Sequence, residues 1–143
     1  MTDQSNLTRA EILAMTPDQL RLAVAEYVFN ASWSHGDGSV GSPLDLLQFQ
    51  DGAVVAYRYY SDVNYTMCVP DYPRDIAAAW TVHKLMSVQI FSKRKRYFDE
   101  LHHLVSKRMS VDLLVSWPDI FAHVEPEDFS RAALITVSEA ANG

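Results

Sequence analysis

The sequence has little cysteine, little glycine and no long apolar run. Cys68 is the single cysteine among 143 residues, so no disulfide can form within the chain. This composition is usual in a reducing compartment. No apolar stretch approaches the roughly 20 residues that a membrane-spanning helix needs, and the start MTDQSNLTRAE is too polar for a secretory signal. We therefore expect an intracellular protein that acts in the cytoplasm and does not bind membranes.

Basic charge is also scarce, and it is unevenly placed. The chain has 12 Lys and Arg against 18 Asp and Glu, a net charge of −6. Half of the basic residues lie in one short span: Lys93, Arg94, Lys95, Arg96, Lys107 and Arg108. The strongly acidic remainder argues against general nucleic-acid binding, because phosphate contacts dominate that affinity. A local anion site, or an acidic face that docks on a basic partner, remains compatible with this pattern.

The sequence lacks the motifs that identify a reaction. It contains no phosphate loop, no dinucleotide fingerprint and no paired-carboxylate motif. Ser32, Ser34 and Ser39 lack the context of a nucleophile elbow, and Cys68 has no recognisable partner base, which favours a buried, inert thiol. We therefore expect neither catalytic residues nor a cofactor.

The length and the 48% hydrophobic content predict a single domain over residues 1–143, with residues 1–8 as a loose leader. Thr16 followed by Pro17 and Gln19 has the signature of a capped helix start. Helical spacing also predicts helices over 71–86, over most of 88–109 and from Pro126 to the end of the chain.

Strand signals lie between these helices. The turn residues Asp51-Gly52, followed by the β-branched and aromatic run AVVAYRYY, predict a hairpin, and residues 63–69 are a further strand candidate. The runs VDLLVSW and DIFAHV indicate two more strands around Trp117-Pro118. The segment SWSHGDGSVGSP is typical of a loop.

Three segments resemble a known family. MTPDQLRLAVAEYVF, DYPRDIAAAWTVHKLM and DFSRAALITVSEA are similar, in this order, to three helices of small phage proteins with the ABA-sandwich domain, and cover about a third of the chain. The resemblance implies an α+β fold, an α-β-α sandwich with helices on both faces of a small, mostly antiparallel sheet, and an origin in a phage or prophage. It implies no established catalytic residues.

The departures from the family pattern carry further expectations. Pro73 stands where a capping serine is usual, so we expect Asp71 to cap the central helix. We expect the Ala-Ala-Ala-Trp face of that helix to dock on the sheet. Residues 87–110 look longer than the family needs and hold the basic run, so this segment is a possible insertion that adds function.

These observations favour a phage-encoded, non-catalytic binding protein that counters host defence in the host-cell cytoplasm by sequestering a nucleotide-derived immune signal. Aromatic rings would stack on the base and cations would hold the phosphates. Such pockets often form between subunits, so we expect a homo-oligomer. The candidate ligand-binding residues are Trp33, His35, Arg58, Tyr60, Arg74, Lys93, Arg94, Arg96 and Tyr97.

Three alternatives remain open. An acidic surface could make the chain a protein–protein inhibitor of a host defence complex, and a phage housekeeping factor is compatible with the same features. His102-His103 with Asp99 and Glu100 invites a metal or hydrolase interpretation. A solvated helix face is the more usual meaning of that cluster, so no metal site is predicted.

Overall fold

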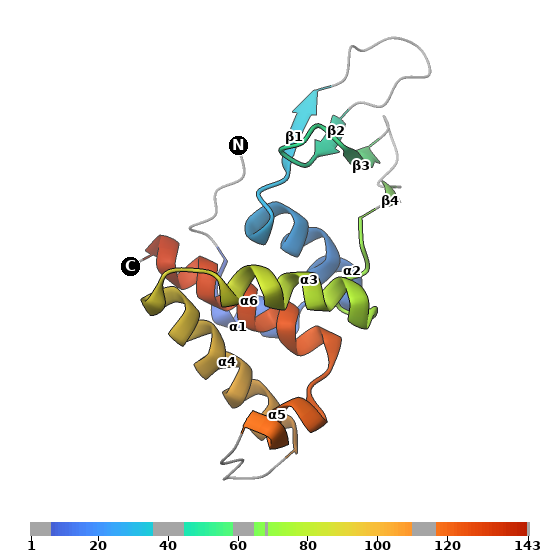
Figure 1. Cartoon of the computed structure of the whole chain (residues 1–143). Coiled ribbons are helices and arrows are strands. Elements are labelled where there is room, and N and C mark those ends of the chain that lie inside the picture. The colour runs from blue at the N-terminus through green and yellow to red at the C-terminus, as the bar shows by residue number, and fades with distance from the viewer. Residues whose placement is uncertain (1–6, 36–44, 59–64, 68, 110–116, 143) are drawn as a thin grey trace.

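The computed structural model describes residues 7–35, 45–58, 65–67, 69–109 and 117–142. They form a group of helices and a small sheet that lies at one end of this group (Figure 1). In chain order the elements are α1 (Arg9–Ala14), α2 (Pro17–Ala23), the π-helix η2 (Val24–Val28), β1 (Ser32–His35), β2 (Asp45–Gln48), β3 (Val54–Arg58), β4 (Tyr65–Met67), α3 (Ile76–Ser87), α4 (Phe91–Met109), α5 (Trp117–His123) and α6 (Pro126–Asn142).

The predicted start of the first long helix is confirmed. The Thr16 side chain accepts a hydrogen bond from the Gln19 backbone N–H, and the Gln19 side chain accepts one from the Thr16 N–H, so the capping box is complete. A shorter helix, α1, precedes it and was not predicted. Its N-cap is Thr8, whose side chain accepts from the Glu11 N–H, an arrangement that satisfies an otherwise unpaired donor.

The sheet has four antiparallel strands in the order β1-β2-β3-β4. The predicted hairpin is confirmed, since β2 and β3 pair across the Asp51-Gly52 turn and Gly52 has a φ of 92°, which suits glycine. Leu47 pairs with Ala56, and both are fully buried. β4 lies within the strand candidate 63–69, whereas β1 falls where a loop was predicted.

Helix α6 lies at the centre of the helical group, where it contacts α1, α2, η2, α3 and α4 (Figure 1). Its start at Pro126 is as predicted, because proline suits the first turn of a helix. Its buried side chains include Phe129, Ala132, Ala133, Ile135 and Thr136.

Helix α3 differs from the expectation in its cap and in its docking partner. Asp75, not Asp71, is the N-cap, and its side chain accepts from the Ala77 N–H at 3.0 Å. The Asp71 carbonyl instead accepts the Asp75 N–H and closes the preceding turn. The alanines of α3 allow another element to approach it closely. That element is mainly α6 and not the sheet. Trp80 is 45% exposed, so it does not fill an interior gap.

The prediction of strands around Trp117-Pro118 is wrong for the described residues, because Trp117–His123 is the helix α5. Pro118 lies in its first turn, where no backbone N–H is needed. Residues 110–116, which hold most of the first predicted strand, lie outside the described residues. Helix α4 is as predicted, and its Tyr97, Leu101 and Val105 are buried. The candidate insertion 87–110 therefore supplies part of the interior.

The α+β class with a small antiparallel sheet is confirmed. In Figure 1 the labelled helices lie on the same side of the sheet, rather than on both faces. The reason is that the apolar faces of α3, α4 and α6 cover one another. None of the helices in the described part of the chain is both long and apolar enough to cross a membrane.

Candidate functional site: an aromatic groove beside a buried histidine

His83 of α3 lies in the middle of a cluster of aromatic side chains that joins α3, α4, α5 and α6. Its Nδ1 and the Tyr97 hydroxyl share a hydrogen bond of 2.9 Å. Five aromatic rings have centroids within 6 Å of the imidazole: Trp80 (4.8 Å), Phe129 (5.1 Å), Phe121 (5.5 Å), Phe98 (5.6 Å) and Tyr97 (5.7 Å). The cluster therefore ties the four helices together.

Tyr97 was expected to stack on a ligand, and the structure corrects this. Its side chain is fully buried and its hydroxyl bonds to His83, so no base can reach the ring. Tyr97 lies on the buried face of α4 with Leu101 and Val105, so its role is in packing. Burial raises the pKa of Tyr97 well above its usual range, and burial lowers the pKa of His83.

The lowered pKa of His83 predicts a loss of stability in mild acid. The unfolded state binds a proton near the ordinary pKa of about 6.5, whereas the folded state resists it. The contribution of neutral His83 to the free energy of unfolding is therefore complete above about pH 6.5. It is lost as the pH falls towards the lowered pKa of the folded state. Between pH 7.5 and 5.5, the wild type should therefore lose more unfolding free energy than His83→Gln in urea titrations. Equal losses would show that another group controls the acid response.

An open groove of about 430 Å³ borders this cluster, between the start of α4 and α5. We call it the aromatic groove, and its lining residues are Phe91, Arg94, Lys95, Phe98, Asp99, Trp117 and Phe121. The rings of Phe98 and Trp117 meet edge to face at 5.1 Å, and Trp117 and Phe121 are 5.9 Å apart. Phe91 is 69% exposed and Trp117 is 40% exposed, so both present ring surface to solvent.

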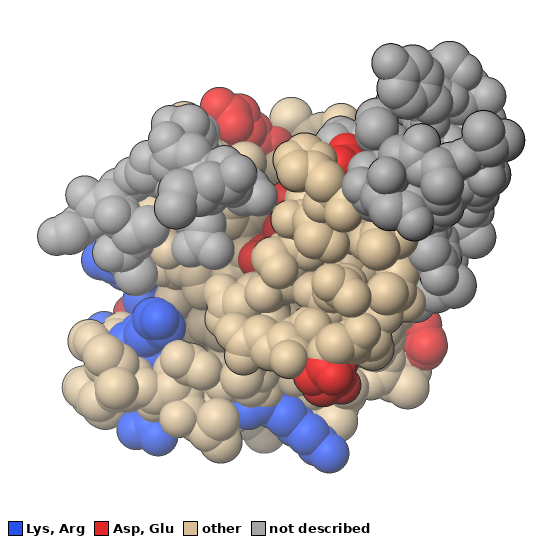
Figure 2. Space-filling view, turned by 90° about the horizontal axis from the view of Figure 1, so that it is seen from above, with Lys and Arg blue, Asp and Glu red and all other residues tan. Residues whose placement is uncertain are grey.

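Cations lie at the edge of the aromatic groove. The Arg94 guanidinium lies 5.7 Å from the centroid of the Phe91 ring, an arrangement that favours a cation over an aromatic face. The Lys95 ammonium pairs with the Asp99 carboxylate at 2.9 Å. Figure 2 shows that the visible Lys and Arg side chains gather towards one side of the molecule. A planar ring that carries an anionic group matches this combination of aromatic surface and positive charge.

Two predicted ligand residues lie on strand β1, outside the aromatic groove. The Trp33 indole N–H donates to the Glu26 carboxylate at 2.8 Å, and burial raises the pKa of Glu26. His35 Nδ1 lies 2.9 Å from the carboxylate of the buried Asp45. Both side chains therefore have partners that anchor β1 to its neighbours.

The remaining predicted residues are also dispersed. Arg74 lies in the turn before α3 and pairs with Asp18 and Asp71 at 3.1 and 3.4 Å. Lys93 and Arg96 are on α4 but do not line the aromatic groove. Arg58 ends β3, with a side chain that is not described, and Tyr60 lies outside the described residues. Arg94 is thus the predicted ligand residue that the structure places in the groove.

Sequence reasoning missed Phe98, Trp117 and Phe121. The spacing of Phe91 and Phe98, seven residues apart on one helix, was a usable signal. Trp117 and Phe121 are four residues apart, which aligns them on a helix but not on a strand. Because this segment was predicted to form strands, Trp117 and Phe121 were not placed on the same face of a helix.

The histidine pair on α4 does not form a metal centre with other described residues. His102 Nδ1 lies 3.4 Å from the Ser106 hydroxyl, and its ring is 5.9 Å from Trp117. His103 lies on another flank of the helix. Within the described ranges, no group of three or more His, Cys, Asp or Glu side chains is arranged to hold a metal ion.

Comparisons of this chain with protein-family models, with curated proteins and with solved structures found no match. The resemblance to phage ABA-sandwich proteins therefore stays a prediction that rests on the three quoted segments.

Proposed function

We propose that this chain is a non-catalytic binding protein that holds a small nucleotide-like ligand in the aromatic groove. The observation that carries the proposal is the presence of Arg94 and Lys95 beside four aromatic rings in one open groove. A base would stack on the exposed faces of Phe91 and Trp117, which contributes roughly 1–3 kcal/mol per base. The phosphate would contact Arg94, whose planar guanidinium suits bidentate binding.

The wider role follows from the resemblance. A phage protein that binds a nucleotide-derived immune signal without altering it would counter host defence by lowering the free concentration of that signal. Sequestration requires about one ligand site per chain and slow release, and it requires no reaction. We propose that the protein acts in this way in the host cytoplasm, as a homo-oligomer.

The test is mass spectrometry of small molecules that denaturation releases from protein purified out of cells with an active nucleotide-signalling defence. We expect the wild type to release an unaltered nucleotide at about one per chain. Arg94→Gln should release at least tenfold less, because a charge-assisted phosphate contact is worth about 1.5–3 kcal/mol. Arg96→Gln is the matched comparison, since Arg96 lies on the same helix and does not line the aromatic groove.

Three other results would contradict the proposed function. Wild-type protein that releases no nucleotide would remove the sequestering role. Equal loss in the Arg94 and Arg96 variants would show that general charge, and not the aromatic groove, retains the ligand. A released product that differs from the cellular nucleotide would indicate an enzyme.

One observation favours a second candidate, a protein that docks on a host complex. Several large apolar side chains on α3 and in the turn between α3 and α4 are exposed: Ile76 (57%), Trp80 (45%), Val88 (77%) and Ile90 (72%). Of these, Trp80 contacts the His83 ring, which Phe121 of the aromatic groove also contacts. Contiguous exposed apolar surface is typical of protein interfaces. A chain without bound nucleotide would favour this candidate.

A further inference from the structure

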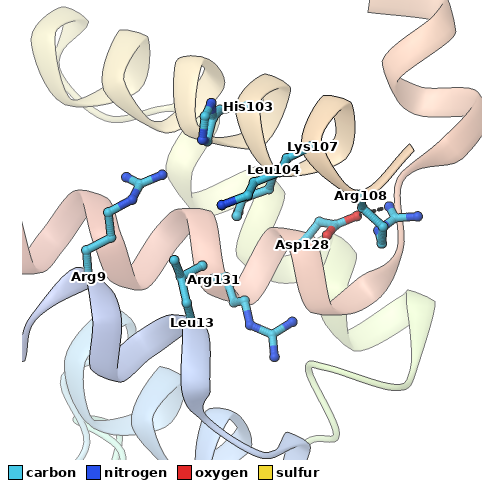
Figure 3. A pocket seen from close by; sticks show the side chains of 8 residues that line it. All are labelled: Arg9, Leu13, His103, Leu104, Lys107, Arg108, Asp128 and Arg131. Carbon is cyan, nitrogen blue, oxygen red and sulfur yellow. Dashed lines mark hydrogen bonds and ion pairs between the residues drawn. The ribbon is translucent and has the colours of Figure 1, made fainter. Parts of the chain in front are cut away.

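A second pocket, of about 360 Å³, lies where α1, α4 and α6 meet (Figure 3). Its lining residues are Arg9, Leu13, His103, Leu104, Lys107, Arg108, Asp128 and Arg131. We call it the cationic pocket, because four of these side chains carry a permanent positive charge. No lining residue is shared with the aromatic groove. At 100° per residue, the two sites lie on opposite flanks of the buried face of α4.

Asp128 is the one carboxylate among the lining residues, and it already has a hydrogen-bond donor and an ion-pair partner. Asp128 is 5% exposed, accepts the Glu125 backbone N–H at 2.8 Å and pairs with Arg108. Arg131 pairs with Glu127 at 3.1 Å and donates to the Met15 carbonyl at 3.1 Å. These contacts hold one side of the cationic pocket in place, and Asp128 is not available to pair with the cations on the other side.

The other side of the cationic pocket brings together three nitrogen-bearing side chains. In Figure 3 the charged ends of Arg9 and Lys107 and the ring of His103 face the same space between α1 and α4. The Arg9 Nη1 donates to Glu100 at 2.6 Å, which fixes the direction of the guanidinium. Lys107 is exposed and has no ion-pair partner in the part of the chain that the structure describes. A compact anion at this point would meet donors from two helices.

We propose that the cationic pocket binds the phosphate group of a small anion, either inorganic phosphate or a phosphate monoester. Lys107 supplies a point charge, and Arg9, oriented by Glu100, supplies directed N–H donors. His103 adds a ring nitrogen that donates a hydrogen bond. Leu13 and Leu104 also line this side of the cationic pocket. Their side chains are apolar, so they offer no hydrogen bonds to a phosphate. This site requires no base stacking, so it is independent of the aromatic groove.

The experiment is isothermal titration calorimetry of the full chain at constant ionic strength, with inorganic phosphate and glycerol 3-phosphate as separate probes. At least one probe should give a saturable curve with one site per chain. Lys107→Gln should weaken binding about tenfold, whereas Lys107→Arg should keep it within about threefold. Lys84→Gln is the matched control: it removes the same charge from an exposed lysine of α3, and binding should be unchanged.

The relative affinity of the two probes identifies the source of the phosphate. Tighter binding of the ester would indicate a phosphorylated metabolite, and tighter binding of inorganic phosphate would indicate the free ion. Heats that do not saturate for either probe would overturn the proposal. Equal weakening of phosphate binding by Lys107→Gln and Lys84→Gln would also overturn the proposal. It would show that the net charge of the protein, and not the cationic pocket, determines the affinity.

Discussion

Phe129→Ala is expected to lower the free energy of unfolding by about 3–5 kcal/mol, the usual cost of removing a fully buried aromatic ring. Phe129 is 0% exposed and lies on α6, the helix that most of the others contact. Its ring packs against His83 at 5.1 Å and edge to face against Trp80 at 6.2 Å. The substitution therefore leaves a cavity where α3 and α6 meet. Urea titrations followed by circular dichroism measure the loss.

Phe91→Ala is the matched control for this prediction. It is the same substitution at a ring that is 69% exposed, at the start of α4. Substitutions at such surfaces usually change stability by less than about 0.5 kcal/mol. A loss at Phe91 as large as that at Phe129 would contradict the packing of the helical group around α6.

Trp117→Ala is expected to weaken binding of an adenine nucleotide by roughly 5- to 150-fold, which corresponds to the 1–3 kcal/mol that stacking contributes per base. Trp117 is 40% exposed and lies between Phe98 and Phe121 in the aromatic groove. Loss of the indole removes the widest ring surface of the groove. Equilibrium dialysis with labelled AMP measures the affinity directly.

Trp33→Ala distinguishes the two places where a base could stack. The sequence suggested Trp33 as a stacking residue, but the structure places it on β1, with its indole N–H bonded to Glu26. Its removal should leave AMP affinity within about twofold of the wild type. The reverse pattern, in which Trp33→Ala weakens binding and Trp117→Ala does not, would move the site to the sheet and reject the aromatic groove.

Local signals in the sequence were enough to predict several elements. The Thr16 capping box, the Asp51-Gly52 hairpin and the start of α6 at Pro126 all depend on residues within a few positions of one another. Such interactions form within a single element or turn, so the order of the residues specifies them. The general class, α+β with an antiparallel sheet, was an expectation from the family resemblance, and these local elements are compatible with it.

Contacts between distant segments decided the rest. Helix α3 rests on α6 rather than on the sheet, because the partner of an apolar face depends on which helix the chain brings beside it. The partner of the Tyr97 hydroxyl, His83, is 14 positions away in the sequence and comes from another helix.

Both candidate sites have the same dependence on tertiary structure. The aromatic groove needs α5 to lie against α4, and the cationic pocket joins Arg9 to residues near positions 103–108 and 131. The sequence contained the basic run and the aromatic residues, but their spacing along the chain does not indicate which of them meet. Packing of α1, α5 and α6 against α4 determines which charges and rings share a surface, because burial of apolar faces selects the partners.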